Sequence, residues 1–186
     1  MIQLKPDNVS PARYSAVMGL LFACTAALNV MESIVSAALP AGMRIGLGNI
    51  VIMAVILAVN LPSAALLVIL KAVFVFLTRG FTAGLLSLTG GFLAFFVTAV
   101  LFQRTNASFI LISTLGSLSH SAGQLLTSRL LLGTDAIFAY APILFAGSAA
   151  AGICTGIVLK AVFPQIERIL QHSDAASSTN REDYQE

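Results

Sequence analysis

Charged residues are scarce in this chain of 186 residues. Only 10% of the residues are Asp, Glu, Lys or Arg, 58% are hydrophobic, and the mean hydropathy is +0.92. A soluble domain has about 25% charged residues, so this chain has too few charges to cover a surface that faces water. The composition excludes a soluble enzyme, a nucleic-acid-binding protein and a disordered chain. We therefore expect a multi-pass protein of the cell membrane.

Cysteine pairs and catalytic signatures are missing as well. Cys24 and Cys154 both lie inside apolar runs, with no CxxC motif and no spacing typical of metal ligands. There is no Walker-type Gly-Lys-Ser/Thr loop, so any step driven by ATP would need partner subunits. There is also no aspartate-rich DDxxD motif, which prenyl elongation uses to hold Mg²⁺. The sequence therefore predicts that the chain alone is no enzyme and holds no metal or cofactor.

Six apolar segments fit a bundle of transmembrane helices. A helix needs about 20 apolar residues to cross roughly 30 Å of hydrocarbon. We expect an all-α domain over residues 12–163, between a cytoplasmic segment (1–11) and a polar, disordered cytoplasmic tail (164–186). Lys and Arg near the span ends favour cytoplasmic termini. The expected spans are about 12–39, 47–59, 62–78, 81–102, 107–132 and 135–163.

Ionisable and amide residues within or beside these spans are the candidate site. Charges at membrane depth are costly, and they usually face the bundle interior or a water-filled cavity. With the predicted orientation they gather in the outer half of the bundle, above an apolar inner half, which indicates a pocket open to the outside. Bases exceed acids, which favours an anionic ligand. The predicted binding residues are Glu32, Arg44, Asn49, Lys71, Arg79, His120, Gln124, Arg129 and Tyr140.

Several of these residues have alternative interpretations. Arg79 and Arg129 lie near a membrane interface, where arginine also extends toward lipid headgroups. Glu32 would form a structural ion pair with Lys71 or with the arginine of the first loop. His120 would be an interhelical hydrogen-bonding residue. Lys71 is too deep to reach the interface easily, so it is the strongest candidate.

Three motifs resemble the Gx transporter family, which is also filed as heptaprenyl diphosphate synthase component I. They are residues 40–49 (PAGMRIGLGN), 87–91 (SLTGG) and 116–124 (GSLSHSAGQ), and the resemblance extends over about residues 12–163. This family in turn resembles the substrate-binding S components of energy-coupling factor (ECF) transporters. Those are six-helix proteins with cytoplasmic termini, in which the loop between the first two helices covers an outward-facing site.

The resemblance implies a substrate-binding subunit for uptake of a small molecule, which works with a coupling subunit and ATPases. In S components an alanine pair of the first helix docks on the coupling subunit. Ala12 with Ala16 and Ala23 with Ala27 are both candidates. The alternative hypothesis is a non-catalytic membrane subunit of isoprenoid or quinone synthesis that presents a lipid-linked diphosphate to an enzyme. A self-sufficient carrier is a weaker option, because no inverted repeat is evident.

Overall fold

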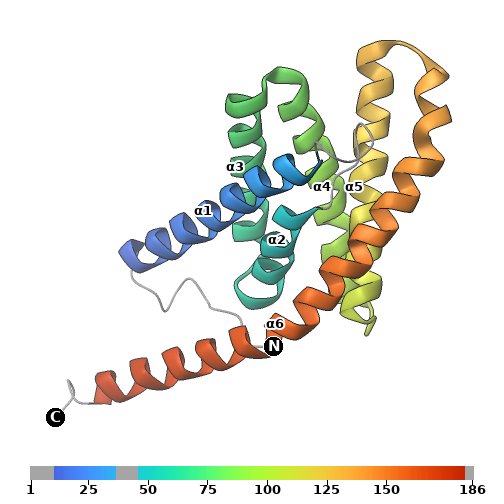
Figure 1. Cartoon of the computed structure of the whole chain (residues 1–186). Helices are drawn as coiled ribbons and strands as arrows, with labels where there is room; N and C mark the ends of the chain where they lie inside the picture. Colours follow the sequence, from blue (N-terminus) through green and yellow to red (C-terminus); the bar gives the residue numbers. More distant parts are fainter. Residues whose placement is uncertain (1–10, 37–45, 183–186) are drawn as a thin grey trace.

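A computed structural model describes residues 11–36 and 46–182 of the chain. Over these residues the protein is all-helical and contains no strand, which confirms the expected helical class (Figure 1). The elements are α1 (Pro11–Ser36), α2 (Leu47–Ala58), α3 (Leu61–Arg79), α4 (Phe81–Arg104), α5 (Phe109–Leu132), the 3-10 helix η2 (Asp135–Tyr140) and α6 (Ala141–Glu182).

Local sequence signals set the helix ends. The Asn60 side chain caps α3 by accepting a hydrogen bond from the backbone N–H of Ser63 at 2.8 Å, and Ser108 caps α5 in the same way. Gly133 ends α5 with a φ of 64°, a left-handed conformation that glycine adopts without strain. The short connections after α3 and after α5 produce two hairpins, α3–α4 and α5–α6. The turns of both hairpins lie at the same end of the bundle (Figure 1).

Four segments among the described residues are long and apolar enough to cross a membrane: most of α1, all of α3 and α4, and the segment 135–165. This finding is consistent with a multi-pass membrane protein, but it does not confirm six spans. The 12 residues of α2 cover only about 18 Å at 1.5 Å per residue. The 24 residues of α5 are long enough, but its serines, histidine and glutamine lower its hydropathy.

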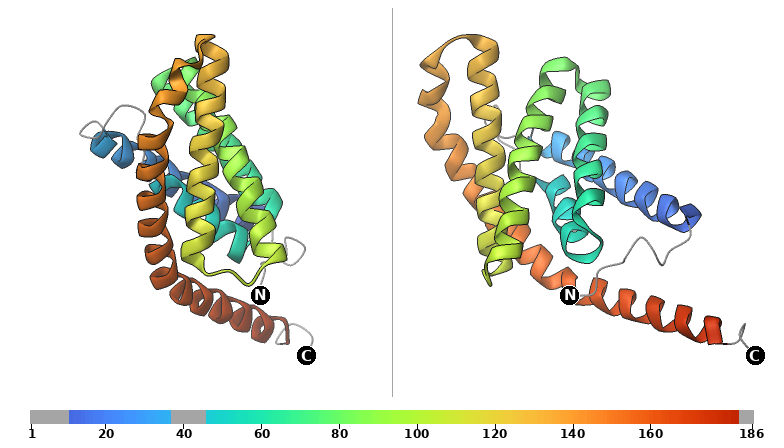
Figure 2. Two further views of the ribbon diagram at one scale, coloured as in Figure 1. Left: turned by 90° about the vertical axis from the view of Figure 1, so that its right-hand side faces the viewer. Right: turned by 180° about the vertical axis from the view of Figure 1, so that it is seen from behind.

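The last helix differs from our expectation. We expected the final span to end near Phe163 and a disordered tail to follow, yet α6 continues through Pro164 to Glu182. Its 42 residues correspond to about 63 Å, roughly twice the thickness of the hydrocarbon core. Figure 2 shows the end of α6 running away from the bundle. The polar residues after Pro164 cannot remain in hydrocarbon, but most are ordinary helix formers. The polar composition after Pro164 therefore predicted where the membrane span ends, but it did not predict where the helix ends.

Helices α4, α5 and α6 pack closely because small residues line their contacts. A Cβ atom added to Gly152 of α6 would lie 2.6 Å from the Cα atom of Thr114, and one added to Gly156 would lie 2.6 Å from that of Ile110. Hydroxyl pairs cross the same interface, Ser121 with Ser148 and Ser113 with Thr155. Small residues and interhelical hydrogen bonds are the usual means of helix association in membranes.

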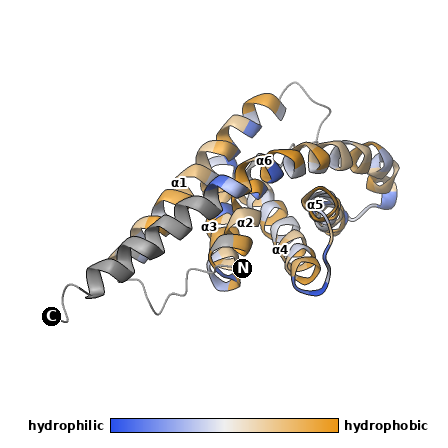
Figure 3. Cartoon of the chain, turned by 90° about the horizontal axis from the view of Figure 1, so that it is seen from below, coloured by the Kyte–Doolittle hydropathy of each residue, from blue (hydrophilic) through white to orange (hydrophobic). Residues whose placement is uncertain are grey.

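Hydrophobic residues predominate along the described helices (Figure 3), and many large apolar side chains are exposed. A soluble protein rarely exposes large apolar patches, so these exposed side chains fit a hydrocarbon environment. Helix α1, which crosses α3 obliquely in Figure 1, buries only a narrow stripe. Large apolar side chains exposed on several helices include Leu20, Ile34, Leu77, Phe96, Leu130 and Leu132.

Candidate functional site

The buried lysine of α3 contacts the first turn of α2. The Lys71 side chain is 5% exposed, and its Nζ atom donates a hydrogen bond to Oδ1 of Asn49 at 2.7 Å. Gly48 leaves space for the lysine, since a Cβ atom there would lie 3.4 Å from Nζ. A buried ammonium group is costly unless it is hydrogen-bonded. The hydrogen bond from Lys71 therefore fixes the orientation of the Asn49 amide.

A buried carboxylate holds the same turn from the other side. Glu32 of α1 is 5% exposed, and its Oε1 atom accepts a hydrogen bond from the backbone N–H of Gly46 at 3.0 Å. The first N–H groups of a helix have no partner within the helix, and the helix dipole favours a negative charge there. The start of α2 is thus hydrogen-bonded both to Glu32 of α1 and to Lys71 of α3.

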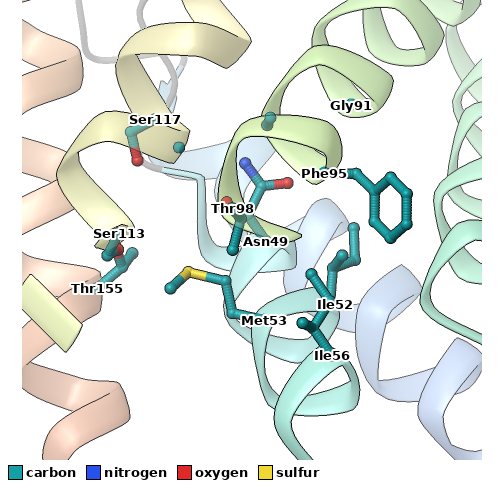
Figure 4. Close-up of a pocket in the computed structure, with 12 residues that line it drawn as sticks. Asn49, Ile52, Met53, Ile56, Gly91, Phe95, Thr98, Ser113, Ser117 and Thr155 are labelled. Carbon is teal, nitrogen blue, oxygen red and sulfur yellow. The ribbon is translucent and has the colours of Figure 1, made fainter. Parts of the chain in front are cut away.

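A cavity lies between α2, α4, α5 and α6 (Figure 4). Asn49, Ile52, Met53 and Ile56 face it from α2, and hydroxyl side chains face it from the other three helices. In this conformation the cavity has room for about one water molecule. None of the residues that line it is ionisable. The hydroxyl residues are Thr98 of α4, Ser113 and Ser117 of α5, and Thr155 of α6.

Some polar groups of the cavity already have hydrogen-bond partners within the protein, and others do not. Ser113 and Thr155 are hydrogen-bonded to each other at 2.6 Å, and Thr155 also donates to the carbonyl oxygen of Ala151. In the part of the chain that the structure describes, no hydrogen bond involves the hydroxyl of Thr98 or of Ser117. Because Lys71 occupies the carbonyl oxygen of the Asn49 amide, its NH₂ group remains to donate elsewhere. One amide and two hydroxyls are thus left for a ligand.

His120 and Gln124 lie in the interface between α4 and α5 and do not line this cavity. Both are buried, and both pack against Gly90 of α4. A Cβ atom at Gly90 would lie 3.0 Å from Cε1 of His120 and 3.0 Å from Cγ of Gln124. This position agrees with the alternative interpretation of His120 as a residue of the helix–helix contact.

The remaining predicted binding residues do not converge. Arg129 forms an exposed ion pair with Asp135. Arg79 is also exposed, and its Nη2 atom donates to a backbone carbonyl of α1 at 3.5 Å. The hydroxyl of Tyr140 is buried without a hydrogen-bond partner among the described residues. Arg44 lies outside the described residues.

The cavity lies in the half of the bundle that we expected to be apolar. Ser113 and Ser117 belong to the first half of α5, near the connection that follows Arg104, and Thr98 belongs to the second half of α4. Asn49 alone, among the predicted binding residues that the structure describes, lines it. The predicted binding residues left out the neutral hydroxyls of Ser113 and Ser117. These two serines nevertheless belong to the same polar stripe at helical spacing as His120 and Gln124.

The alanines predicted to dock a partner are accessible. All four of them, Ala12, Ala16, Ala23 and Ala27, are exposed on α1. Their docking role stays a prediction.

Comparison with known proteins identifies one family. The family model described as heptaprenyl diphosphate synthase component I matches residues 21–162, which include Lys71, Asn49 and all the residues that line the cavity. No curated protein and no solved structure matches the chain, so the further resemblance to ECF S components stays a prediction. The word component in the description implies that the members are parts of multi-subunit complexes. The chain belongs to the heptaprenyl diphosphate synthase component I family.

Proposed function

We propose that this protein is the substrate-binding membrane subunit of an uptake system and that a small molecule binds in the cavity between α2, α4, α5 and α6. The supporting observation is that the Asn49 side chain lines one cavity together with the hydroxyls of Thr98 and Ser117, neither of which has a hydrogen-bond partner among the described residues. Burying polar groups without hydrogen bonds destabilises a protein. A set of such groups that converges inside an apolar bundle favours a ligand that completes their hydrogen bonds.

The charge beside the site supports a substrate with an anionic group. In this conformation the cavity has about 20 Å³ of space, whereas ligand pockets commonly span about 300–1,000 Å³, so we propose that the surrounding helices separate when the substrate binds. The positive charge of Lys71 lies one hydrogen bond away from the lining, through Asn49. A carboxylate that replaces Asn49 as the partner of Lys71 would gain a charge-assisted hydrogen bond, which is roughly twice as strong as a neutral one.

The proposed subunit is non-catalytic and depends on partners for energy. The chain has no nucleotide-binding loop, so a coupling subunit and ATPases would drive release of the substrate. The exposed alanines of α1 leave that helix free for close contact with such a partner.

Native mass spectrometry of gently extracted protein tests this proposal. We expect the wild-type protein to carry a bound small molecule, and Thr98→Val to lose it because valine keeps the shape but not the hydroxyl. The matched control is Thr82→Val, at an exposed position near the start of the same helix. An equal amount of ligand in both variants, or none in the wild-type protein, would contradict the proposal.

A second candidate function is supported by the description of the family. The protein would be a non-catalytic membrane subunit of isoprenoid synthesis and would present a lipid-linked diphosphate to a soluble prenyltransferase. Affinity purification from membranes separates the two candidates: capture of a prenyltransferase supports the second, and capture of ATPases supports the first.

A further inference from the structure

A second hollow lies on the outside of the bundle, between α3 and α4. It is an open groove with about 230 Å³ of space. Ile69, Val73 and Phe76 line it from α3, and Phe81, Leu85 and Leu88 line it from α4. The cavity described above contacts α4 only from Gly91 onward, so the two hollows share no lining residue.

The shape of the groove follows from the sizes of its residues. Ala72 and Gly84, the smallest lining residues, are buried, whereas large apolar side chains on both helices are exposed. The missing Cβ atom of Gly84 matters, because it would lie 2.6 Å from Cβ of Phe76. Small residues thus form the floor and large ones form the walls. This shape fits a hydrocarbon chain.

A basic residue, Arg79, lies about one helical turn beyond the groove at the end of α3, although it is not among the lining residues. Both helices are candidate membrane spans, and the 19 residues of α3 measure about 28 Å, close to the thickness of the hydrocarbon core. Arg79, the last residue of α3, continues the helical stripe formed by Ile69, Ala72 and Phe76, with spacings of three and four residues. It therefore lies at the level of the lipid headgroups.

The charge of Arg79 is not balanced by a carboxylate. Within the described ranges, the one ion pair is that of Arg129 with Asp135. Arg79 instead makes a long hydrogen bond of 3.5 Å to the neutral carbonyl oxygen of Asn29. A guanidinium group in this position attracts phosphate, which it can bind with two parallel hydrogen bonds.

We propose that this groove binds one acyl chain of an anionic phospholipid, whose phosphate contacts Arg79. The lipid matches both parts of the site: its chain fills an apolar groove that no other described segment covers, and its headgroup supplies the missing negative charge. A free anion would leave the groove empty, and a neutral lipid would leave the charge of Arg79 unbalanced. This site is independent of the uptake function proposed above.

Native mass spectrometry in detergent with equal amounts of phosphatidylglycerol and phosphatidylcholine tests the proposal. We expect the wild-type protein to retain phosphatidylglycerol preferentially. Arg79→Gln should lower this preference about five-fold, since one basic residue near an anionic surface contributes about 1 kcal/mol. Arg104→Gln is the matched control, because Arg104 is likewise an exposed arginine at the last position of a helix, α4, but it lies at the opposite end of α4 from the groove.

A second variant tests the groove independently of the charge. Val73→Trp should fill the groove from its half-exposed rim without disturbing the core, and retention of both lipids should fall. The proposal is overturned if Arg79→Gln keeps the wild-type preference or if Val73→Trp retains lipid as the wild-type protein does. A prenyl diphosphate retained in place of the phospholipid would also overturn it.

Discussion

Asn49 contacts the buried charged residue Lys71 and also lines the cavity. Its carbonyl oxygen accepts from Lys71, while its side chain lines the cavity. One side chain therefore has two tasks, to accept a hydrogen bond from a buried ammonium group and to line the cavity. The chemistry of the site depends on this orientation more than on the lysine itself, because Lys71 does not line the cavity.

Replacing Asn49 tests the first of these tasks. Asn49→Leu removes one hydrogen-bond acceptor of Lys71, and we expect the free energy of unfolding to fall by about 1.5–3 kcal/mol, as for a hydrogen bond to a charged group. Asn49→Asp is the matched control, since it keeps an acceptor and should retain the wild-type stability or exceed it. Thermal unfolding in detergent measures both variants. Equal melting temperatures for Asn49→Leu and the wild-type protein would refute this role.

At the scale of elements, α5 and α6 form the most closely packed pair. Gly152 and Gly156 allow the two backbones to approach, and the hydroxyl pairs then form between them. The hydrogen bonds depend on this close approach of the backbones, because short side chains such as Ser and Thr reach each other only across closely packed helices.

Gly152→Ala tests this close approach. The added Cβ atom would lie 2.6 Å from a backbone carbon, so the helices must separate, and we expect a loss of about 1–3 kcal/mol, as for overpacking elsewhere. Gly19→Ala is the control, because a Cβ atom at Gly19 of α1 has nothing within 4 Å. That variant should match the wild-type melting temperature or exceed it. If both variants unfold alike, the interface is not as tight as described.

The hydrogen bond between Ser113 and Thr155 is testable by a double-mutant cycle. Interhelical hydrogen bonds in membranes contribute about 0.6 kcal/mol on average, so Ser113→Ala and Thr155→Ala should show a coupling of that size. Ser119 donates to Leu115 in its own helix, and the pair Ser119→Ala and Thr155→Ala should show no coupling. Chemical unfolding of the single and double variants measures both couplings, and a null result for the first pair would exclude the contact.

At the scale of the whole molecule, both cysteines report on the position of the bundle in the membrane. Cys24 of α1 and Cys154 of α6 are exposed, yet each lies within a candidate membrane span. Thiols react as thiolates, and hydrocarbon excludes both the ionised form and a charged reagent. We expect a membrane-impermeant maleimide to label neither cysteine in intact vesicles and both after denaturation in SDS. Labelling of Cys24 in intact vesicles would place α1 outside the hydrocarbon.

Helix positions followed closely from the sequence. Apolar runs predicted the bounds of α1 to α5 to within a few residues, because turns and caps are local, whereas α6 continues well beyond the predicted end near Phe163. The number of membrane crossings did not follow from the sequence in the same way. Packing against other helices positions the short α2 and the polar α5, and the hydropathy of these two helices does not determine whether they cross the membrane.

The sequence by itself determined that this chain is an apolar, helical membrane protein, where its helices begin, and which family it resembles, since composition, caps and motifs are local properties. Only the tertiary structure decided which polar groups meet. Lys71 reaches Asn49, and neutral hydroxyls from three helices face one cavity. The physical reason is that such convergence depends on how helices distant in sequence rotate and pack against one another, and small residues such as Gly90 and Gly152 control that packing.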